Sequence, residues 1–455
     1  KMINKMPKSW VHVAIADICD LINGRAFKPS DWTSKGLPII RIQNLNNDDA
    51  EFNYCDFEVD QKFIVGKGQL LFAWSGTPGT SFGAHIWNKG KAVLNQHIFK
   101  VQNNKEIIEK VFLMYLLNHK VSEYVAKAHG TAGLAHITKG KFENSEIPLP
   151  PLNEQKRIVA KIEELFTKLD AGIDSLKKVK VQIKRYRQAV LKAAFEGKLT
   201  ENLRRDDEYD EDLIPLSWSR YFLPDVMAKK LNNGYSGKPV KYETPIRVLS
   251  LSATTSGIFN GSCYKYLDES FSPESPFWLK KDDILLQRGN TLEYVGVPAI
   301  YKGNDNQYLF PDLMIRLTIN KSMVEPNFLC FLLSWEKIRN YMRDNAVGTA
   351  GSMPKINQEV LKKLPVYLPP LPEQHQIVSE IERRFSVADE AEKLIDQSLK
   401  QAERLRQSIL KRAFEGKLVP QDPNDEPASV LLERIRAEKA RLEAEGKAGK
   451  MKKVK

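Results

Sequence analysis

Two segments of the chain carry hydroxyl, backbone N–H and guanidinium groups, which are chemical groups that proteins use to contact nucleic acids. The segment Ser75 to Thr80, with the sequence SGTPGT, offers hydroxyls and backbone N–H groups that could position phosphates. The segment Arg288 to Thr291 takes the matching place in the second half of the chain, and its guanidinium can pair with two acceptors of a guanine. Hairpin tips are the alternative interpretation of both segments, and the arginine favours contacts with DNA.

Amide side chains gather at two further points of the first half. Arg41, Gln43 and Asn44 lie within four residues of each other, and Gln96 and His97 form a second group. Amides of this kind read adenine edges, although about half of such residues serve only as loop caps. Arg247 of the second half is a further candidate. The candidate DNA-contacting residues are therefore Arg41, Gln43, Asn44, Ser75, Gly76, Thr77, Gly79, Thr80, Gln96, His97, Arg247, Arg288, Gly289, Asn290 and Thr291.

Motifs for catalysis are missing from the sequence. An adenine methyltransferase needs an Asn/Asp-Pro-Pro-aromatic motif, whereas the two Pro-Pro pairs here precede long helical patterns. The phosphate-binding pattern G-x-x-x-x-G-K-[ST] does not occur, which argues against NTP hydrolysis by this chain. Glu154-Gln155-Lys156 has the E-x-K shape of some nucleases but lacks a preceding Pro-Asp. We therefore predict no catalytic residue.

The composition is that of a folded globular chain with a polyanionic partner. The 455 residues are 42% hydrophobic and 28% charged, which suggests two to four domains and excludes a disordered chain. The net charge of +12 favours a partner such as DNA. The four cysteines form no C-x-x-C pair, and the seven histidines show no zinc-finger spacing with them, which predicts a reducing compartment and no structural metal in this chain. No apolar run reaches about 18 residues, so we expect a cytoplasmic protein without a membrane contact.

An internal repeat organises the chain. Residues 151–199 align without a gap over residues 370–418, at an offset of 219, with 22 identities in 49 pairs. The identities lie at the two ends of the repeat, and residues 171–181 contribute none. Pro7-Lys8-Ser9-Trp10 is echoed by Pro215-Leu216-Ser217-Trp218, and a GTAG segment stands at 130–133 and at 348–351. The GTAG segments are more typical of tight turns than of phosphate sites.

Each repeated segment has the pattern of one long helix. In the first copy, residues 154–196 hold no proline, and apolar residues recur every three or four positions. Both copies stop at Phe-Glu-Gly-Lys-Leu, which places Gly197 and Gly416 just beyond the helix ends. About 44 residues at 1.5 Å per residue make a rod of roughly 65 Å. Such a rod needs a partner for its apolar stripe, so we expect the two copies to form a coiled coil.

An antiparallel pair explains the domain order best. It places one globular domain at each end of the rods, related by a pseudo-twofold axis, whereas a parallel pair would require a return path along the full rod. We expect two mixed α/β domains that are largely unlike in sequence, with strands at 37–42, 69–73, 97–101, 246–251, 283–286 and 313–319 and a helix at 107–126. The predicted segments are domain 1 at 1–150, helix 1 at 151–199, domain 2 at 200–369, helix 2 at 370–418, and a tail at 419–455 with a short charged helix that packs near the first domain.

The duplicated Pro-Leu-x-Glu-Gln-x-x-Ile-Val start and the Arg-Gln-x-(Val/Ile)-Leu-Lys-x-Ala-Phe-Glu-Gly-Lys-Leu end resemble those of the specificity subunit of type I restriction-modification enzymes. The resemblance covers the whole chain except the tail after about residue 420. It implies two target-recognition domains, each reading one half of a split DNA site. It also implies that the helices set the spacer and dock two modification subunits, which are adenine methyltransferases.

The resemblance further implies where cofactors and partners belong. S-adenosylmethionine, ATP and Mg are expected on partner subunits, with restriction subunits completing a complex for phage defence. The repeated rod ends mark candidate partner contacts, which are Glu154, Gln155, Arg187, Phe195, Glu373, Gln374, Arg406 and Phe414. Two other functions stay open from the residues: an autonomous DNA-modifying enzyme, and a coiled-coil adaptor without DNA binding.

Overall fold

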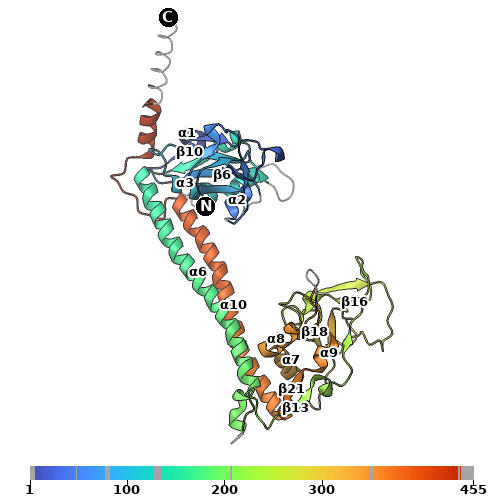
Figure 1. Ribbon diagram of the computed structural model, residues 1–455. Coiled ribbons are helices and arrows are strands. Elements are labelled where there is room, and N and C mark those ends of the chain that lie inside the picture. The colour runs from blue at the N-terminus through green and yellow to red at the C-terminus, as the bar shows by residue number, and fades with distance from the viewer. Residues whose placement is uncertain are drawn as a thin grey trace. The chain divides into compact units, whose positions relative to one another are not determined.

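The computed structural model describes residues 6–47, 49–76, 82–127, 135–204, 208–348, 353–438 and 441. The chain divides into two compact units: unit 1 comprises Lys1–Ser175 and Ser398–Lys455, and unit 2 comprises Leu176–Gln397. Two 44-residue helices, α6 (Leu152–Phe195) and α10 (Leu371–Phe414), contribute to both units (Figure 1). Each unit therefore holds one globular domain, the start of one long helix and the end of the other.

The long helices pack antiparallel in both units, as the sequence predicted. In unit 1, Arg406 late in α10 pairs with Asp170 of α6. In unit 2, Arg187 late in α6 donates to Asp389 of α10 at 2.6 Å. Since both arginines lie late in their helix and both aspartates lie earlier in the other, the helices run in opposite directions, and the parallel alternative is wrong.

Both long helices end in the same way. Gly197 and Gly416 adopt left-handed φ values of 71° and 69°, as expected for residues that terminate a helix. A Cβ atom at Gly197 would collide with Pro215, and a Cβ atom at Gly416 would collide with Pro7. The repeated proline before each globular domain thus packs against the end of the long helix that belongs to the same unit.

The domain of unit 1 is built on a four-stranded antiparallel sheet. Its strand order is β2-β10-β6-β8, and a second four-stranded sheet has the order β4-β3-β9-β5. The strands are β1 Val11–Ala14, β2 Cys19–Asn23, β3 Leu37–Ile40, β4 Asn53–Cys55, β5 Ile64–Val65, β6 Gln69–Ala73, β7 Ser75–Gly76, β8 Gly83–Trp87, β9 Ala92–Leu94, β10 Ile98–Asn103, β11 Ala135–His136 and β12 Glu146–Leu149. The helices are α1 Ile15–Ile18, α2 Ile42–Asn46, α3 Lys110–His119, α4 Val121–Lys127 and α5 Lys139–Glu143.

The domain of unit 2 repeats this plan. Its four-stranded sheet has the order β14-β20-β18-β19, and a three-stranded sheet has the order β15-β17-β16. The strands are β13 Ser219–Phe222, β14 Asn232–Asn233, β15 Pro239–Val240, β16 Ile246–Leu249, β17 Tyr264–Leu267, β18 Ile284–Gln287, β19 Pro298–Ile300, β20 Met314–Leu317 and β21 Pro365–Leu368. The helices are α7 Pro326–Ser334, α8 Glu336–Asp344 and α9 Gln358–Lys362. Short 3₁₀ turns lie at 29–31, 61–63, 198–203, 223–226 and 251–253.

The two domains share details beyond strand order. The first strand of each domain pairs with the strand just before the long helix, as β1 with β12 and β13 with β21. Gly24 lies against the backbone of Asn95, and Gly234 lies against the backbone of Pro311, so closely that a Cβ atom would clash. The two sequences differ at most positions, yet the fold is the same mixed α/β arrangement.

Several predicted boundaries are wrong, for local reasons. The strand expected at 37–42 ends at Ile40, because the Asn44 side chain accepts the Arg41 backbone N–H at 3.0 Å and starts helix α2. The strand expected at 246–251 gives way to a 3₁₀ turn at Leu251. The single helix expected at 107–126 begins after the capping residue Glu109 and breaks into α3 and α4.

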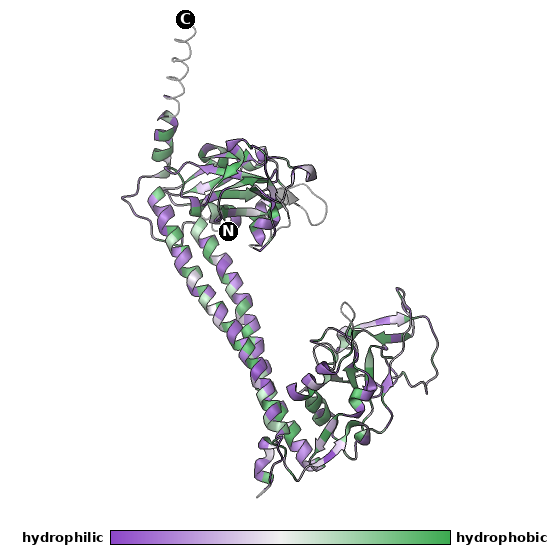
Figure 2. Ribbon diagram, in the orientation of Figure 1, coloured by the Kyte–Doolittle hydropathy of each residue, from purple (hydrophilic) through white to green (hydrophobic). Residues whose placement is uncertain are grey.

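The long helices complete the hydrophobic core of each domain. In unit 1, Ile158 and Ile162 of α6 and Ala413 of α10 join the core around Phe112. In unit 2, apolar residues late in α6 and early in α10 do the same. The hydropathy colouring in Figure 2 shows green residues on both long helices. Residues 428–438 are helical, and Ala428 within them is buried in the unit 1 core.

The described residues include neither a membrane-spanning helix nor a cluster of metal ligands. None of the helices there is both long and apolar enough to span a membrane. No group of three or more His, Cys, Asp or Glu side chains in that part of the chain could hold a metal ion. All four cysteines are free thiols. Burial raises the pKa of Cys330 to about 12, so this thiol stays protonated.

Candidate nucleic-acid interface

The predicted amide segments of unit 1 meet at one small cavity. Parallel pairing places Ile40 of β3 beside Leu94 of β9, so the residues that follow both strands lie together. The cavity has a volume of about 140 Å³ and is lined by Arg41, Ile42, Gln43, Asn95, His97 and Ile98. A guanidinium, two amides and an imidazole therefore converge at one point of the domain, and these are the side-chain types that read base edges.

Arg41 is held in place by its neighbours. Its guanidinium lies 5.2 Å from the ring centre of Trp32 and 3.5 Å from the side-chain oxygen of Asn53. The predicted contact Asn44 has a different role, because its buried side chain donates to the carbonyl oxygens of Ala50 and Glu51. Asn44 therefore shapes the loop that carries Arg41, and its contact with DNA stays a prediction.

Gln96 and His97 lie in the turn that leads into β10. Their side chains approach each other at 3.2 Å between the Gln96 amide nitrogen and the His97 Nε2 atom. The His97 ring lies 5.2 Å from that of Trp74, whose Nε1–H donates to Asn23 at 3.1 Å. Sequence reasoning missed Trp74, although an aromatic residue directly before a Ser-Gly loop is a usable signal.

The first predicted phosphate loop is only partly described. Ser75 and Gly76 form strand β7, which pairs with β11, and both are buried. Gly76 has a φ of 141°, which favours glycine at this position. Ser75 and Gly76 thus support the turn, and their contact with phosphates stays a prediction. Thr77, Gly79 and Thr80, together with the first GTAG segment, lie outside the described residues.

In unit 2, the loop after β18 is fixed by internal hydrogen bonds. Asn290 donates to the side-chain oxygen of Gln287 at 2.8 Å, and this buried glutamine donates to the Leu251 carbonyl at 2.7 Å. Gly289 is buried and bridges to Lys355. Asn290 and Gly289 thus help to hold the loop in place, and their contact with DNA stays a prediction.

Two residues of this loop remain accessible. Arg288 is half-buried, and its guanidinium donates to the Asp312 carbonyl at 3.1 Å. Thr291 is exposed, and its backbone N–H donates to Asn290 at 2.8 Å. Asp312 lies two residues before β20, as Gln96 lies two residues before the corresponding strand β10. The guanidinium of Arg288 therefore contacts the turn of unit 2 that corresponds to the Gln96 turn of unit 1.

Arg247 belongs to an aromatic surface on strands β16 and β17. It pairs with Tyr266 across the sheet, and its guanidinium lies 5.0 Å from the ring centre of Tyr264. The Tyr264 hydroxyl raises the pKa of Tyr266 to about 12, with burial and Glu243 acting in the same direction. Tyr266 is therefore a neutral phenol at pH 7, able to donate or accept a hydrogen bond. The period-two spacing of Tyr264 and Tyr266 could have revealed this pair.

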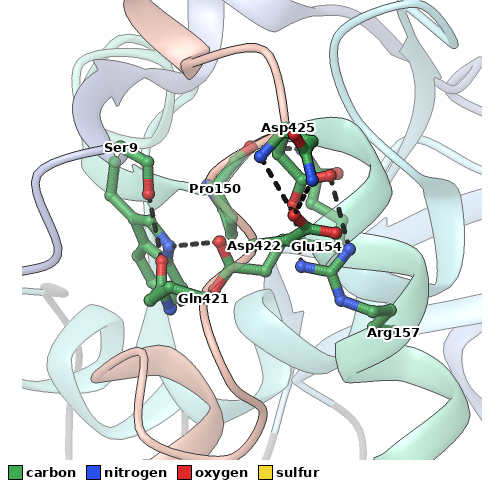
Figure 3. Close-up of polar contacts among 10 residues, drawn as sticks. Ser9, Pro150, Glu154, Arg157, Gln421, Asp422 and Asp425 are labelled. Carbon is green, nitrogen blue, oxygen red and sulfur yellow. Dashed lines mark hydrogen bonds and ion pairs between the residues drawn. The ribbon is translucent and has the colours of Figure 1, made fainter.

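The repeated glutamates join the long helices to the globular domains. Glu154 accepts hydrogen bonds from Trp10 Nε1 at 3.0 Å and from Gln421 Nε2 at 2.6 Å (Figure 3). Glu373 accepts from Trp218 Nε1 at 3.3 Å, and also from a threonine and an arginine that follow α6. Burial raises the pKa of Glu154, and the bonds from Trp10 and Gln421 oppose that rise.

The repeated glutamines cap the first helix after each main sheet. Gln155 accepts the backbone N–H of Glu109 at 2.7 Å, and Gln374 accepts that of Glu325 at 2.9 Å. Both glutamines are 0% exposed, and each also donates to two backbone carbonyls. Each therefore holds the start of a domain helix against the start of a long helix.

These positions give a physical reason for the repeat. Phe195 packs edge-on against Phe328, and Phe414 packs edge-on against Phe112, so the long helices end in matching aromatic contacts. The predicted partner contacts that lie buried at these junctions are Glu154, Gln155, Phe195, Glu373, Gln374 and Phe414, and their contact with a partner stays a prediction. They are repeated because each unit needs the same junction.

Arg187 and Arg406 are the two predicted contact residues that stay partly exposed. Their side chains are 23% and 28% exposed. Arg187 lies 5.3 Å from the ring centre of Phe385, and Arg406 lies 4.3 Å from that of Phe166. Arg187 corresponds to Arg406, and Phe385 corresponds to Phe166, at the offset of 219. The internal repeat therefore includes this contact between an arginine of one long helix and a phenylalanine of the other.

Comparisons with known proteins agree over nearly the whole chain. A family model described as "Type I restriction modification DNA specificity domain" matches residues 7–185 and 226–401. The EcoKI specificity subunit of Escherichia coli is 28% identical over 458 residues, covering 96% of this chain and 97% of that protein. The MjaVIII specificity subunit of Methanocaldococcus jannaschii is 26% identical, covering 91% of this chain and 94% of that protein.

Two solved structures show the same fold. A chain from a study of assembly and conformational transition in the type I R-M system has a TM-score of 0.67 at 18% identity. It covers 91% of this chain and 100% of its own length. The HsdS subunit from Thermoanaerobacter tengcongensis has a TM-score of 0.51 at 17% identity, covering 91% and 98%.

Proposed function

The chain belongs to the type I restriction-modification DNA specificity family and is a specificity subunit that recognises DNA targets, and we propose that each of its two globular domains reads one half of an interrupted site. The observation that carries this proposal is the shared strand order of the four-stranded sheets β2-β10-β6-β8 and β14-β20-β18-β19, around which the two domains place different polar side chains. Two readers with different side chains select two different half-sites, so the target is asymmetric.

The half-sites are read by the accessible polar groups. In unit 1 these are Arg41, Gln43, Gln96 and His97, and in unit 2 they are Arg247, Arg288 and Thr291. Each bidentate pair of hydrogen bonds between such a group and the correct base favours that base over a wrong one by roughly 1–3 kcal/mol of binding free energy. The guanidinium groups are already supported by an aromatic ring or a backbone carbonyl. These side chains therefore lose little conformational entropy when DNA binds.

The long helices set the distance between the half-sites. Each has 44 residues, and at 1.5 Å per residue this is about 65 Å of helix, close to two turns of DNA at roughly 34 Å each. The spacer of the site is then a property of helix length. Two modification subunits bind the helix pair, one in each unit, because α6 and α10 present pseudo-equivalent surfaces.

The chemistry belongs to partner subunits. S-adenosylmethionine is bound by the adenine methyltransferase subunits, while ATP and Mg act with the restriction subunits. This chain contributes double-stranded DNA recognition in the cytoplasm and no catalytic group. Its exposed lysines and arginines add salt-dependent affinity for phosphates.

The test is methylation mapping with the complete methyltransferase. The chain is expressed with its modification subunits, and methylated adenines are mapped in wild-type, Arg41→Ala and Arg288→Ala complexes. We expect one bipartite site for the wild type, relaxation of one half-site in Arg41→Ala and of the other in Arg288→Ala. Relaxation of the same half-site by both variants contradicts the assignment. Methyl transfer by the isolated chain would support an autonomous enzyme, and a complex without sequence-selective DNA binding would support an adaptor.

A further inference from the structure

The loop between β18 and β19 has an exposed leucine at its tip. Residues 291–293 are exposed, whereas Gly289 before them and Val295 after them are buried. Leu292 lies at the centre of this tip and is 56% exposed. Its neighbour Thr291 is one of the groups proposed to read the unit 2 half-site. A leucine in this position gains free energy by burial against another apolar surface.

A buried arginine fixes the tip from behind. The backbone N–H of Val295 donates to the Thr291 carbonyl at 3.0 Å and closes a tight turn. The guanidinium of Arg339 in α8 donates to the Val295 carbonyl, and also to the Glu293 carbonyl at 2.9 Å. Burial lowers the pKa of Arg339 to about 10, so this group keeps its charge at pH 7. The backbone that carries Leu292 is therefore held in one conformation.

Further apolar side chains are exposed around the start of the same loop. Val347 is 68% exposed and Met353 is 46% exposed. Lys355 forms β-bridges with both Gly289 and Val347. The sulfur of Met353 lies 3.4 Å from the place of a Cβ atom at Gly289. Exposed apolar side chains that gather on one surface mark a site of interaction, so this loop combines base-reading polar groups with an apolar contact surface.

We propose that Leu292 inserts between two neighbouring base pairs of the half-site read by unit 2 and partly unstacks them. Proteins that kink DNA use leucine and other apolar side chains as wedges of this kind. The inference rests on the proposed role of each globular domain as the reader of one half-site. Unit 2 then selects steps that unstack easily, in addition to the bases that its polar groups contact.

The position of Leu292 favours DNA over a protein partner. It directly follows Thr291 and lies four residues after Arg288, so DNA that is read by these groups passes close to the leucine. Glu293, the acidic residue of the tip, lines a cleft with three cationic side chains, those of Lys184, Arg185 and Arg343. These cations offset the repulsion between Glu293 and DNA phosphates.

A second apolar contact within DNA is the methyl group of thymine in the major groove. A side chain that packs on this methyl group leaves the base stack intact, whereas a wedge opens it. Measuring base stacking in the complex therefore separates the two contacts.

The experiment uses the full chain in complex with its modification subunits. Methylation mapping first identifies the unit 2 half-site as the one that Arg288→Ala relaxes. The fluorescent base 2-aminopurine, which brightens when it is unstacked, then replaces one base of this half-site at a time, leaving out the methylated adenine and its neighbours. We expect one position to brighten at least roughly threefold when the wild-type complex binds.

Three variants assign the brightening to the leucine. Leu292→Ala should return the bright position to the level of the free duplex. Leu292→Met keeps an apolar wedge and should retain the signal. Leu216→Ala is the matched control, because Leu216 is 60% exposed and lies outside this loop, and it should leave the signal unchanged.

Affinity for damaged DNA provides an independent measurement. An abasic nucleotide at the bright position removes base stacking before the protein binds. The ratio of affinities for abasic and intact DNA should be at least roughly fivefold higher for the wild type than for Leu292→Ala. Any lost contact to the missing base affects both proteins equally, so the comparison cancels it.

Three results would overturn the inference. Selective binding without a bright position, or with one that Leu292→Ala leaves unchanged, contradicts insertion. An effect of Leu292→Ala that disappears when uracil replaces a thymine, with stacking intact, assigns the leucine to a methyl group. Loss of assembly with the modification subunits in the absence of DNA assigns it to a protein contact. If the wild-type complex binds no DNA selectively, the proposed function itself fails, which is distinct from selective binding without unstacking.

Discussion

The four-stranded sheets of unit 1 and unit 2 have the same strand order, but the polar residues around them differ. Unit 1 presents Arg41, Gln43 and His97 around one cavity, whereas unit 2 presents Arg288 against a backbone carbonyl and Arg247 on a tyrosine surface. The loops can differ because the sheets beneath them are held by buried strands whose order does not depend on loop chemistry. Recognition and folding thus use separate residues.

The junctions between domain and long helix show the opposite behaviour. Trp10 donates to Glu154 and Trp218 donates to Glu373, and both glutamates are almost fully buried. A buried carboxylate without donors would destabilise the fold by several kcal/mol, so each unit must supply the whole set of partners. This requirement explains why the repeat is strictest at the helix ends and absent at 171–181.

The largest expected effect comes from changing the helices that both units share. Inserting seven helix-forming residues into both 171–181 and 390–400 preserves the apolar stripe and adds about 10.5 Å of helix. At about 3.4 Å per base pair this lengthens the spacer by roughly three base pairs and leaves both half-sites unchanged. Methylation mapping of the reconstituted methyltransferase gives the result.

An insertion in one helix alone provides the control for that experiment. It mismatches the antiparallel pair and should reduce activity without producing a defined new spacer. Altered half-sites with an unchanged spacer, after insertion in both helices, would refute the role of helix length.

The next effect concerns the buried glutamines. Gln155→Ala and Gln374→Ala each leave one N–H group and two carbonyls without their side-chain partner, which should cost about 2–4 kcal/mol of unfolding free energy. Hydrogen exchange should rise at the start of α3 for the first variant and at the start of α7 for the second. Gln407→Ala, an exposed glutamine of α10, is the control with an effect below about 0.5 kcal/mol. Crossed effects, in which each variant loosens the other unit, would contradict the separation of the units.

Sequence periodicity and repetition were sufficient for the helices, their ends and the family. The left-handed Gly197 and Gly416 follow from the Phe-Glu-Gly-Lys-Leu motif, and the antiparallel pairing follows from the domain order. Sequence periodicity does not predict which residues far apart in the chain form hydrogen bonds with each other. Asn44 and Gln155 looked like functional polar groups, because a side chain that satisfies buried backbone has the same residue type as one that reads a base.

The cavity of unit 1 was predictable only in part. Its segments at 41–43 and 95–97 were both identified as candidate contacts, but their meeting depends on the parallel pairing of β3 with β9. Parallel pairing between short strands far apart in sequence leaves no local pattern. Trp32, which supports Arg41, and Trp74, which lies beside His97, were not among the predicted contacts, although Trp74 directly precedes a Ser-Gly segment.

A smaller effect on the free energy of unfolding is expected from the ion pairs between α6 and α10. Arg187→Ala removes ion pairs to Asp389 and Glu392, whereas Arg406→Ala removes the ion pair to Asp170, and each variant also removes a cation–π contact, for an expected loss of about 0.5–1.5 kcal/mol. Double-mutant cycles with Asp389→Ala and Asp170→Ala should give coupling energies equal within about 0.5 kcal/mol. Arg404→Ala, an exposed arginine of α10, serves as control. A coupling energy present in one unit and absent in the other would show that the contacts are not equivalent.

The smallest expected effect is the pH dependence of stability that comes from Glu164 in unit 1 and Glu380 in unit 2. Hydrogen bonds from Lys161 and Lys168 lower the pKa of Glu164 to about 2, and those from Arg383 and Arg384 lower the pKa of Glu380 to about 2. Because both values lie below the ordinary 4.5, each carboxylate stabilises the folded chain above that pH and loses its contribution as the pH falls from about 4.5 to 2. Thermal unfolding of Glu164→Gln and Glu380→Gln should therefore show a slightly lower Tm at pH 7 and converge with the wild type near pH 2. Added salt should shrink both differences, since these groups face solvent, and a difference that persists at pH 2 would assign the effect to packing rather than charge.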